Sequence, residues 1–200
     1  IATAAPGSGA WAIAHLERGT DRTRHNDPVG AQEDLIAACD ALHRLGDRRD
    51  TDLCLSQLAN HYRRIGDIDE AQRLLAGLLS AAQRTGEHYD ASIYAYNLAH
   101  VLMAQARWDE ALRSARAAEQ ASIRLNDRLG QGYAGRLLAH VLMRQGQIDQ
   151  ALARVELALR QIDQDADERE LINARLLQAE LLARQGVALR AEGMQGRVVV

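Results

Sequence analysis

Apolar residues along the chain recur at the spacing of an amphipathic helix. Between residues 51 and 65 they lie three or four positions apart, at Leu55, Leu58, Ala59, Tyr62 and Ile65, which places them on one face of a helix. A glycine and an aspartate interrupt this pattern, and a second amphipathic stretch follows over 68–85. No stretch shows the alternation of a half-buried strand. The pattern predicts an all-α protein built from antiparallel helix pairs.

The same pattern repeats with a 40-residue period. Small residues recur in the first helix of each pair at Ala59, Ala99, Ala139 and Ala179, and in the second helix at Ala31, Ala71, Ala111, Ala151 and Ala191. Helix-ending positions keep the same step, in the series Gly66, Ala106, Gly146, Gly186 and the series Gly46, Gly86, Asn126, Ala166. Small residues let helices approach closely, and glycine readily adopts the left-handed conformation that ends a helix. The register therefore predicts complete repeats at 51–90, 91–130 and 131–170.

The register weakens at both ends of the chain. Asp27 and Pro28 read as the cap and first turn of a helix over 28–47, because aspartate is a favoured cap and proline a favoured first residue. Its partner is expected near Gly9–Arg18, with the polar stretch Gly19–Asn26 between them. Residues 1–50 are therefore interpreted as an irregular first hairpin or cap. Residues 171–200 are interpreted as an incomplete last repeat, in which a second helix beginning near Val187 would be short. The chain either was cut inside a larger protein, or ends in an apolar tail that docks onto its own array or a neighbour's.

Charge and composition exclude several classes of function. The net charge is −3, and all 24 basic residues are arginine, interleaved with acidic residues. Without a basic stripe, direct binding of nucleic acid is not expected. No uninterrupted apolar run is long enough to span a membrane.

Motifs for metal binding and catalysis are missing from the sequence. Cys39 and Cys54 lie outside any CxxC or Cys/His cluster, and we interpret them as two buried thiols rather than a disulfide or metal site. His100 and His140 occupy matching positions in adjacent repeats, but two histidines without a nearby third ligand make a poor metal site. No phosphate-binding loop, HExxH motif or nucleophile elbow occurs. We therefore expect no cofactor, no metal and no catalytic residue, with any enzymatic activity in a domain outside this chain.

The segments NLAHVLMAQARWDEALRSARAA (97–118) and LLAHVLMRQGQIDQALARVELA (137–158) resemble tetratricopeptide repeats. Leu58, Ala59, Tyr62, Gly66 and Ala71 match the pattern of this family. Ala106 and Gln178 depart from it, and the usual repeat is shorter, at 34 residues. The resemblance implies a right-handed superhelical array of about four to five hairpins, forming one array over 1–200. The long repeat resembles those of bacterial regulators such as MalT- and LuxR-like activators, aspartate-phosphatase-like quorum regulators and certain diguanylate cyclases.

In such an array the first helix of each pair lines the concave side. Counting in register, the residues expected to face this groove and contact a partner are Asn60, Arg63, Tyr96, His100, Met103, Arg136, His140, Met143 and Glu180. This mixture suits an extended peptide or a helix. The clamp by which related proteins hold chaperone tails requires a lysine where this chain has Ser56, so a chaperone tail is not expected.

The first hypothesis for function is a protein-interaction module that binds a peptide or helix, as the regulatory part of a larger bacterial signalling or assembly protein. The alternative is a domain that senses a signal peptide or small metabolite and controls an attached output domain, such as a diguanylate cyclase or DNA-binding domain. We expect a cytoplasmic location, or a periplasmic one if an upstream signal peptide was removed. Self-association through the C-terminal end is a further expectation.

Overall fold

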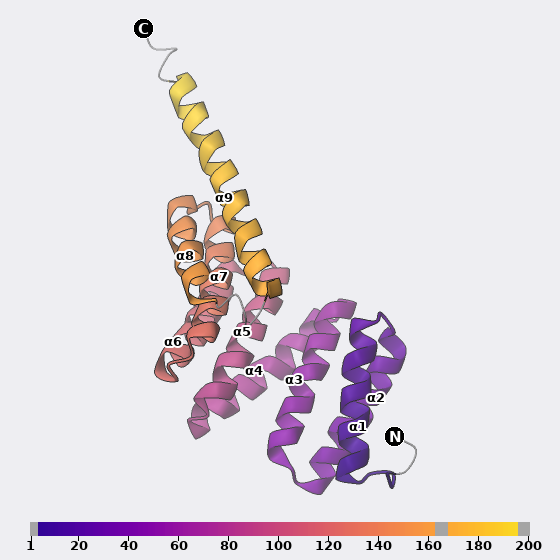
Figure 1. The fold of residues 1–200 in the computed structure, drawn as a ribbon. Helices are drawn as coiled ribbons and strands as arrows, with labels where there is room; N and C mark the ends of the chain where they lie inside the picture. The colour runs from indigo at the N-terminus through magenta and orange to yellow at the C-terminus, as the bar shows by residue number, and fades with distance from the viewer. Residues whose placement is uncertain (1–3, 163–167, 196–200) are drawn as a thin grey trace. The chain divides into compact units, whose positions relative to one another are not determined.

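Residues with a positive φ angle end seven of the helices and recur every 20 residues. They are Asn26, Gly46, Gly66, Gly86, Ala106, Asn126 and Gly146. In the computed structural model, which describes residues 4–162 and 168–195, the described chain is helical and contains no strand (Figure 1). The helices are α1 (Gly9–Arg24), α2 (Pro28–Leu45), α3 (Arg48–Ile65), α4 (Ile68–Thr85), α5 (His88–Ala104), α6 (Trp108–Arg124), α7 (Arg128–Arg144), α8 (Ile148–Gln161) and α9 (Glu168–Gln195). The predicted all-α fold of helical hairpins is confirmed.

Ala106 occupies a turn position that glycine holds at the matching Gly66 and Gly146, and its φ is 56°. A non-glycine residue in this left-handed conformation destabilises the folded state by about 1–2 kcal/mol. Replacing it with glycine removes this strain, but glycine also has more freedom in the unfolded chain, which offsets part of the gain. We expect Ala106→Gly to raise the free energy of unfolding by roughly 0.5–1 kcal/mol. Gly146→Ala, the same exchange one repeat later, should lower it by a similar amount. Urea denaturation of both variants checks this; shifts of the same sign would contradict it.

The first hairpin is regular, and the expectation of an irregular one was wrong. Helix α1 continues through the polar stretch to Arg24, and Asn26 (φ 61°) makes the turn. Gly19 is buried because it is a contact point: a Cβ there would lie 2.8 Å from Cγ of Leu35. The polar stretch that was expected to separate the two helices is therefore part of α1 as far as Arg24, and its glycine serves helix packing.

The last helix also differs from the expectation. Helix α9 runs through Gly186 to Gln195 without a turn, so no second helix begins near Val187. Gly186 is not among the residues with positive φ, unlike Gly146 one repeat earlier. Residues 196–200, which include the proposed docking tail, lie outside the described part of the chain.

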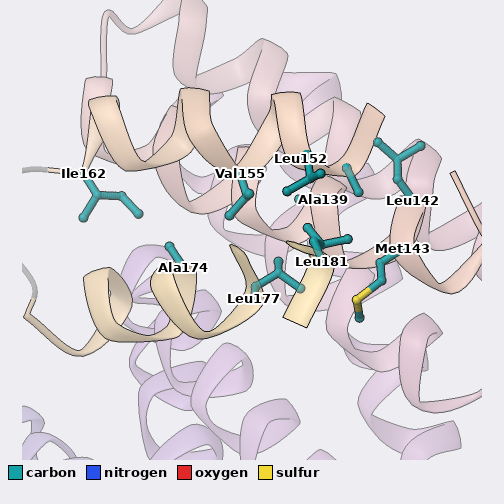
Figure 2. Close-up of a cluster of buried hydrophobic side chains, with 10 residues drawn as sticks. Ala139, Leu142, Met143, Leu152, Val155, Ile162, Ala174, Leu177 and Leu181 are labelled. Atoms are coloured by element: carbon teal, nitrogen blue, oxygen red, sulfur yellow. The ribbon is translucent and has the colours of Figure 1, made fainter. Parts of the chain in front are cut away.

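The chain divides into two compact units, Ile1–Arg84 and Thr85–Val200, and each is described by itself. The core of the first unit contains Leu35, Leu42 and Leu58, with Leu74 of α4 packed against them. The core of the second unit joins α7, α8 and α9 (Figure 2), through Ala139, Leu142, Met143, Ala151, Leu152, Val155, Ile162, Ala174, Leu177 and Leu181. That one array spans 1–200 stays a prediction.

Cys39 and Cys54 form a disulfide between α2 and α3, with their Cα atoms 5.4 Å apart. The prediction of two separate thiols was wrong. Both residues are buried, at 5% and 0% exposure, and they lie on the faces by which the two helices contact each other. This separation is within the usual range for a disulfide.

Asp34 is a buried carboxylate that joins α2 to α1. It accepts hydrogen bonds from Arg18 Nε at 2.7 Å and Arg22 Nη1 at 2.9 Å, and its Oδ1 lies 2.8 Å from His15 Nδ1. Burial raises the pKa of Asp34, but its hydrogen bonds and charge interactions with Arg18, Arg22 and His15 lower it by more. The pKa therefore lies below its ordinary value. The ionised carboxylate therefore stabilises the first hairpin.

We expect Asp34→Asn to lower the free energy of unfolding of the first unit by about 2 kcal/mol, as charge-assisted hydrogen bonds are lost. Because the folded pKa is depressed, the contribution of Asp34 is complete above about pH 4 and is lost as the pH falls through the folded pKa. Urea denaturation at neutral and acidic pH, followed by Trp11 fluorescence, measures both effects. Equal acid sensitivity in the variant would refute this role.

His61 is a second buried polar group in the first unit. It is 1% exposed and lies where the next two repeats have the buried Val101 and Val141. Its Nδ1 is 3.2 Å from the hydroxyl of Thr23, which donates its hydrogen to the carbonyl of Gly19. Nδ1 is therefore the protonated nitrogen, and Nε2 is buried without a hydrogen-bond partner among the described residues. Burial, and to a smaller extent Arg64, lowers the pKa of His61.

A histidine with a depressed folded pKa makes stability fall as the pH drops below about 6.5, since the unfolded chain then binds the proton more readily. We expect the first unit to be less stable at about pH 5.5 than at about pH 7.5. His61→Val, which copies the neighbouring repeats, should reduce this difference and raise stability at both values. Urea denaturation in the two buffers tests it, and an unchanged pH dependence would rule out His61 as the source.

Candidate functional site

The first helices of the hairpins in the second unit contact one another directly: α5 contacts α7, and α7 contacts α9. The second helices pack against them, α6 against α5 and α7, and α8 against α7 and α9. The side chains at Tyr89, Ile93, Tyr96, His100 and Met103 lie on one face of α5, since they are three or four residues apart. We call this face, with its counterparts 40 and 80 residues later on α7 and α9, the first-helix face.

A polar network crosses the first-helix face through all three helices. Arg136 on α7 donates from Nη2 to the Tyr96 hydroxyl on α5 at 2.9 Å, and from Nε to the Glu170 carboxylate on α9 at 2.6 Å. Arg136 is 8% exposed. Burial lowers the pKa of Arg136, but Tyr96 and Glu170 outweigh that effect, so the pKa is raised. The network fixes the register of α5, α7 and α9.

Two of the predicted groove residues are structural. Arg136 was expected to face the groove and contact a partner, but its guanidinium is buried and bonded to Tyr96 and Glu170. Met143 was expected in the groove, but it is 3% exposed and packs in the core with Leu177 and Leu181 of α9 (Figure 2). Both side chains are buried because the first helices also contact one another, α5 with α7 and α7 with α9. The periodicity within one helix does not show such a contact.

The other predicted residues of α5 and α7 lie half-buried on the first-helix face. The Tyr96 and His100 rings meet edge to face, with centroids 4.8 Å apart, and Met103 packs partly against Leu102 and Val141. Burial lowers the pKa of His140; Arg136, Arg144 and Arg184 lower it further, while Glu180 opposes them. His140 is therefore kept neutral by its surroundings.

The remaining predicted residues are more peripheral. Glu180 on α9 is exposed and forms an ion pair with Arg184 at 2.7 Å. Asn60 and Arg63 are half-buried on α3, in the first unit. The structure therefore brings Tyr96, His100, Arg136 and His140 into one region.

A cavity of about 440 Å³ opens between α5, α6 and α7. Its lining consists of Tyr89, Ser92, Ile93, Tyr96, Ala118, Ser122, Asp127, Leu129, Gly130 and Tyr133. Tyr89 and Ile93 are 62% and 36% exposed. The centroids of the Tyr96 and Tyr133 rings are 6.4 Å apart, with the planes inclined at 44°. We call this cavity the tyrosine pocket.

Most residues of this pocket were not among those predicted from the sequence. Tyr89 and Ile93 lie on the same face as Tyr96, toward the start of α5, and Leu129 and Tyr133 are their counterparts 40 residues later. Continuing the helical step toward the beginning of each first helix would have found them. The sequence could not show that the small residues Ala118 and Ser122 of α6 would leave space beneath them.

Among the described residues, no three histidine, cysteine, aspartate or glutamate side chains are grouped so that they could hold a metal ion. Within that part of the chain, no helix combines the length and the hydropathy required to cross a membrane.

Comparison with known proteins gives a family match over part of the chain. Residues 50–126 match the family model described as tetratricopeptide repeat. The sequence has no significant match among curated proteins.

Solved structures share the fold at low identity. BtubC (BKLC) from P. vanneervenii is 18% identical, with a TM-score of 0.62, covering 95% of this chain and 89% of that one. Nearly identical TPR-like repeats of a putative kinesin light chain from Podosopora anserina give a TM-score of 0.66 at 15% identity, covering 96% and 98%. A variant of those repeats gives 0.70 at 16% identity, covering 93% and 92%. Residues 50–126 of this chain are thus similar in sequence to tetratricopeptide repeats, and the described chain shares its fold with solved TPR-like repeat structures.

Proposed function

We propose that this chain is a protein-interaction module that binds a peptide or helical segment on the first-helix face of its second unit. Tetratricopeptide repeats generally mediate protein–protein interaction and are typically non-catalytic scaffolds. The observation that supports this location is the tyrosine pocket, where exposed Tyr89 and Ile93 adjoin the half-buried Tyr96 and Tyr133. Aromatic side chains beside an apolar surface are typical of protein interfaces. Regulation of a larger bacterial signalling or assembly protein is part of the proposal.

A matched pair of variants tests the location. Ile93 on the first-helix face and Leu157 on α8 are almost equally exposed, at 36% and 37%, so arginine at either position should leave the fold intact. Peptides selected from a displayed random library on the wild-type chain should lose at least about tenfold in affinity on Ile93→Arg, because a positive charge replaces an apolar contact. They should bind Leu157→Arg normally. Equal binding to all three proteins would exclude the first-helix face.

The second candidate function is sensing of a signal peptide or small metabolite. It is favoured by the volume of the tyrosine pocket, which lies within the range for small-molecule sites. An output domain in the full-length gene product, such as a diguanylate cyclase or a DNA-binding domain, would support this function. A full-length product consisting of repeats alone would argue against it.

The disulfide favours one of the two expected cellular compartments. Disulfides persist in oxidising environments and are rare in the cytosol. The Cys39–Cys54 bond therefore supports the periplasmic alternative over the cytoplasmic one. Thiol-specific mass tagging of the protein in freshly lysed, acid-quenched cells tests this: a periplasmic protein should take up no tag until it is reduced, whereas two tags before reduction would indicate the cytoplasm.

Self-association through the C-terminal end is also proposed. Ile172, Leu176 and Leu182 on α9 are 49%, 64% and 52% exposed. Sedimentation velocity of the wild type and of Leu182→Glu tests this. A concentration-dependent dimer that disappears in the variant would support self-association, and a monomer at every concentration would exclude it.

A further inference from the structure

The tyrosine pocket combines aromatic rings with a single charge. Tyr89 and Tyr96 come from α5, and Tyr133 comes from α7. Among the described lining residues, only Asp127 is charged. Its carboxylate accepts a hydrogen bond from the backbone N–H of Gly130 at 2.9 Å, as the N-cap of α7. The carboxylate is therefore held in place before any ligand arrives.

We propose that the tyrosine pocket binds a basic side chain, arginine or lysine, of the partner segment. This inference rests on the proposed function and adds the chemistry of the residue that anchors the partner. The faces of tyrosine rings attract cations, and Tyr96 and Tyr133 present two inclined rings side by side. The aliphatic stem of arginine or lysine can cover Ile93 and Leu129 while its charged end reaches the polar part of the pocket.

Asp127 favours a basic side chain in the tyrosine pocket over an apolar, aromatic or acidic one. An apolar or aromatic side chain would displace water from the carboxylate without replacing its hydrogen bonds, which is unfavourable. An acidic side chain would be repelled by it. Arg136, which donates a hydrogen bond to the hydroxyl of the lining residue Tyr96, does not oppose a bound cation strongly, because its charge is paired with Glu170 at 2.6 Å. A basic side chain alone satisfies both the rings and the carboxylate.

The chain offers a conservative variant for the test. Asp127→Asn removes the charge but keeps a side chain that caps helices equally well. Asp47→Asn is the matched control, since Asp47 is the N-cap of α3, accepts a hydrogen bond from the Asp50 backbone N–H at 3.0 Å, and belongs to the first unit. Thermal melting of both variants verifies that the folds are intact.

The probes are peptides from a displayed random library selected on the wild-type chain, followed by synthetic pairs in which the enriched basic residue is arginine or its neutral isostere citrulline. We expect selection to enrich arginine or lysine at one position. Citrulline should weaken binding about tenfold on the wild type and on Asp47→Asn, but only about threefold on Asp127→Asn, where the attraction of the rings for the charge remains. Tyr89→Leu should weaken the arginine peptide, whereas Tyr89→Phe, which keeps the ring, should not.

The outcomes separate this inference from the proposed function. Selected peptides that lose binding on Ile93→Arg but carry no basic anchor, or whose citrulline penalty is the same on Asp127→Asn as on the wild type, would overturn the basic-side-chain assignment and leave the first-helix face as the binding surface. If the wild type selects no peptide, or the peptides bind Ile93→Arg unchanged, the proposed function fails together with the inference.

Discussion

Replacing Arg136 with methionine should lower the free energy of unfolding of the second unit by about 3–5 kcal/mol. The guanidinium holds the Tyr96 hydroxyl and the Glu170 carboxylate, and the Glu170 side chain is only 16% exposed. Without Arg136, that carboxylate remains largely buried and loses the cation with which its charge is paired. Urea denaturation followed by Trp108 fluorescence in a Trp11→Phe background measures the effect, because Trp108 is in the second unit and Trp11 in the first.

The double variant Arg136→Met/Glu170→Gln separates the cost of an unpaired charge from the value of the pair itself. Buried ion pairs replaced together by neutral residues often cost little. The next repeat has Leu176 in the position of Arg136, so an apolar side chain is compatible with this face of a first helix. We expect the double variant to recover most of the lost stability. A loss below about 1 kcal/mol in the single variant would show that Arg136 is not structural.

Breaking the Cys39–Cys54 disulfide should lower the free energy of unfolding of the first unit by about 3 kcal/mol. The bond joins residues 15 positions apart, and closing a loop of that length restricts the unfolded chain by roughly this amount. The Cys39→Ala/Cys54→Ala variant should show the loss in urea denaturation followed by Trp11 fluorescence in a Trp108→Phe background. The second unit, measured through Trp108 in the Trp11→Phe background, should be unchanged.

A reducing agent provides an independent version of this experiment. It should destabilise the wild-type first unit and leave the double alanine variant unaffected. Should reduction change neither the midpoint nor the number of titratable thiols, the two cysteines would not be bonded in solution.

The turns and helices of the central repeats could be predicted because their chemistry is local. Glycine and asparagine adopt the left-handed conformation readily, and they recur in register at Gly46, Gly66, Gly86 and Asn126. The prediction failed where contacts between helices determine the structure. Gly19 serves packing against Leu35 rather than a turn, and the disulfide depends on which faces of α2 and α3 meet.

The candidate site was predicted in part for the same reason. The 40-residue step places Tyr96 and His100 on the first-helix face, and the structure puts their rings in contact. The burial of Arg136 could not be predicted, because its partner Glu170 is 34 residues away and therefore outside the register. Tyr89 and Tyr133 could have been found by counting along each first helix in steps of three or four residues. The cavity beside them could not, because it depends on the packing of α6.

Chemical-shift mapping of a selected peptide on the isotope-labelled chain tests the central claim most directly. If the first-helix face of the second unit is the binding surface, the largest changes will occur at Tyr89, Ile93, Tyr96, Leu129 and Tyr133, with small changes along the exposed faces of α6 and α8. The largest changes along those faces of α6 and α8, with the tyrosine pocket unaffected, would contradict it.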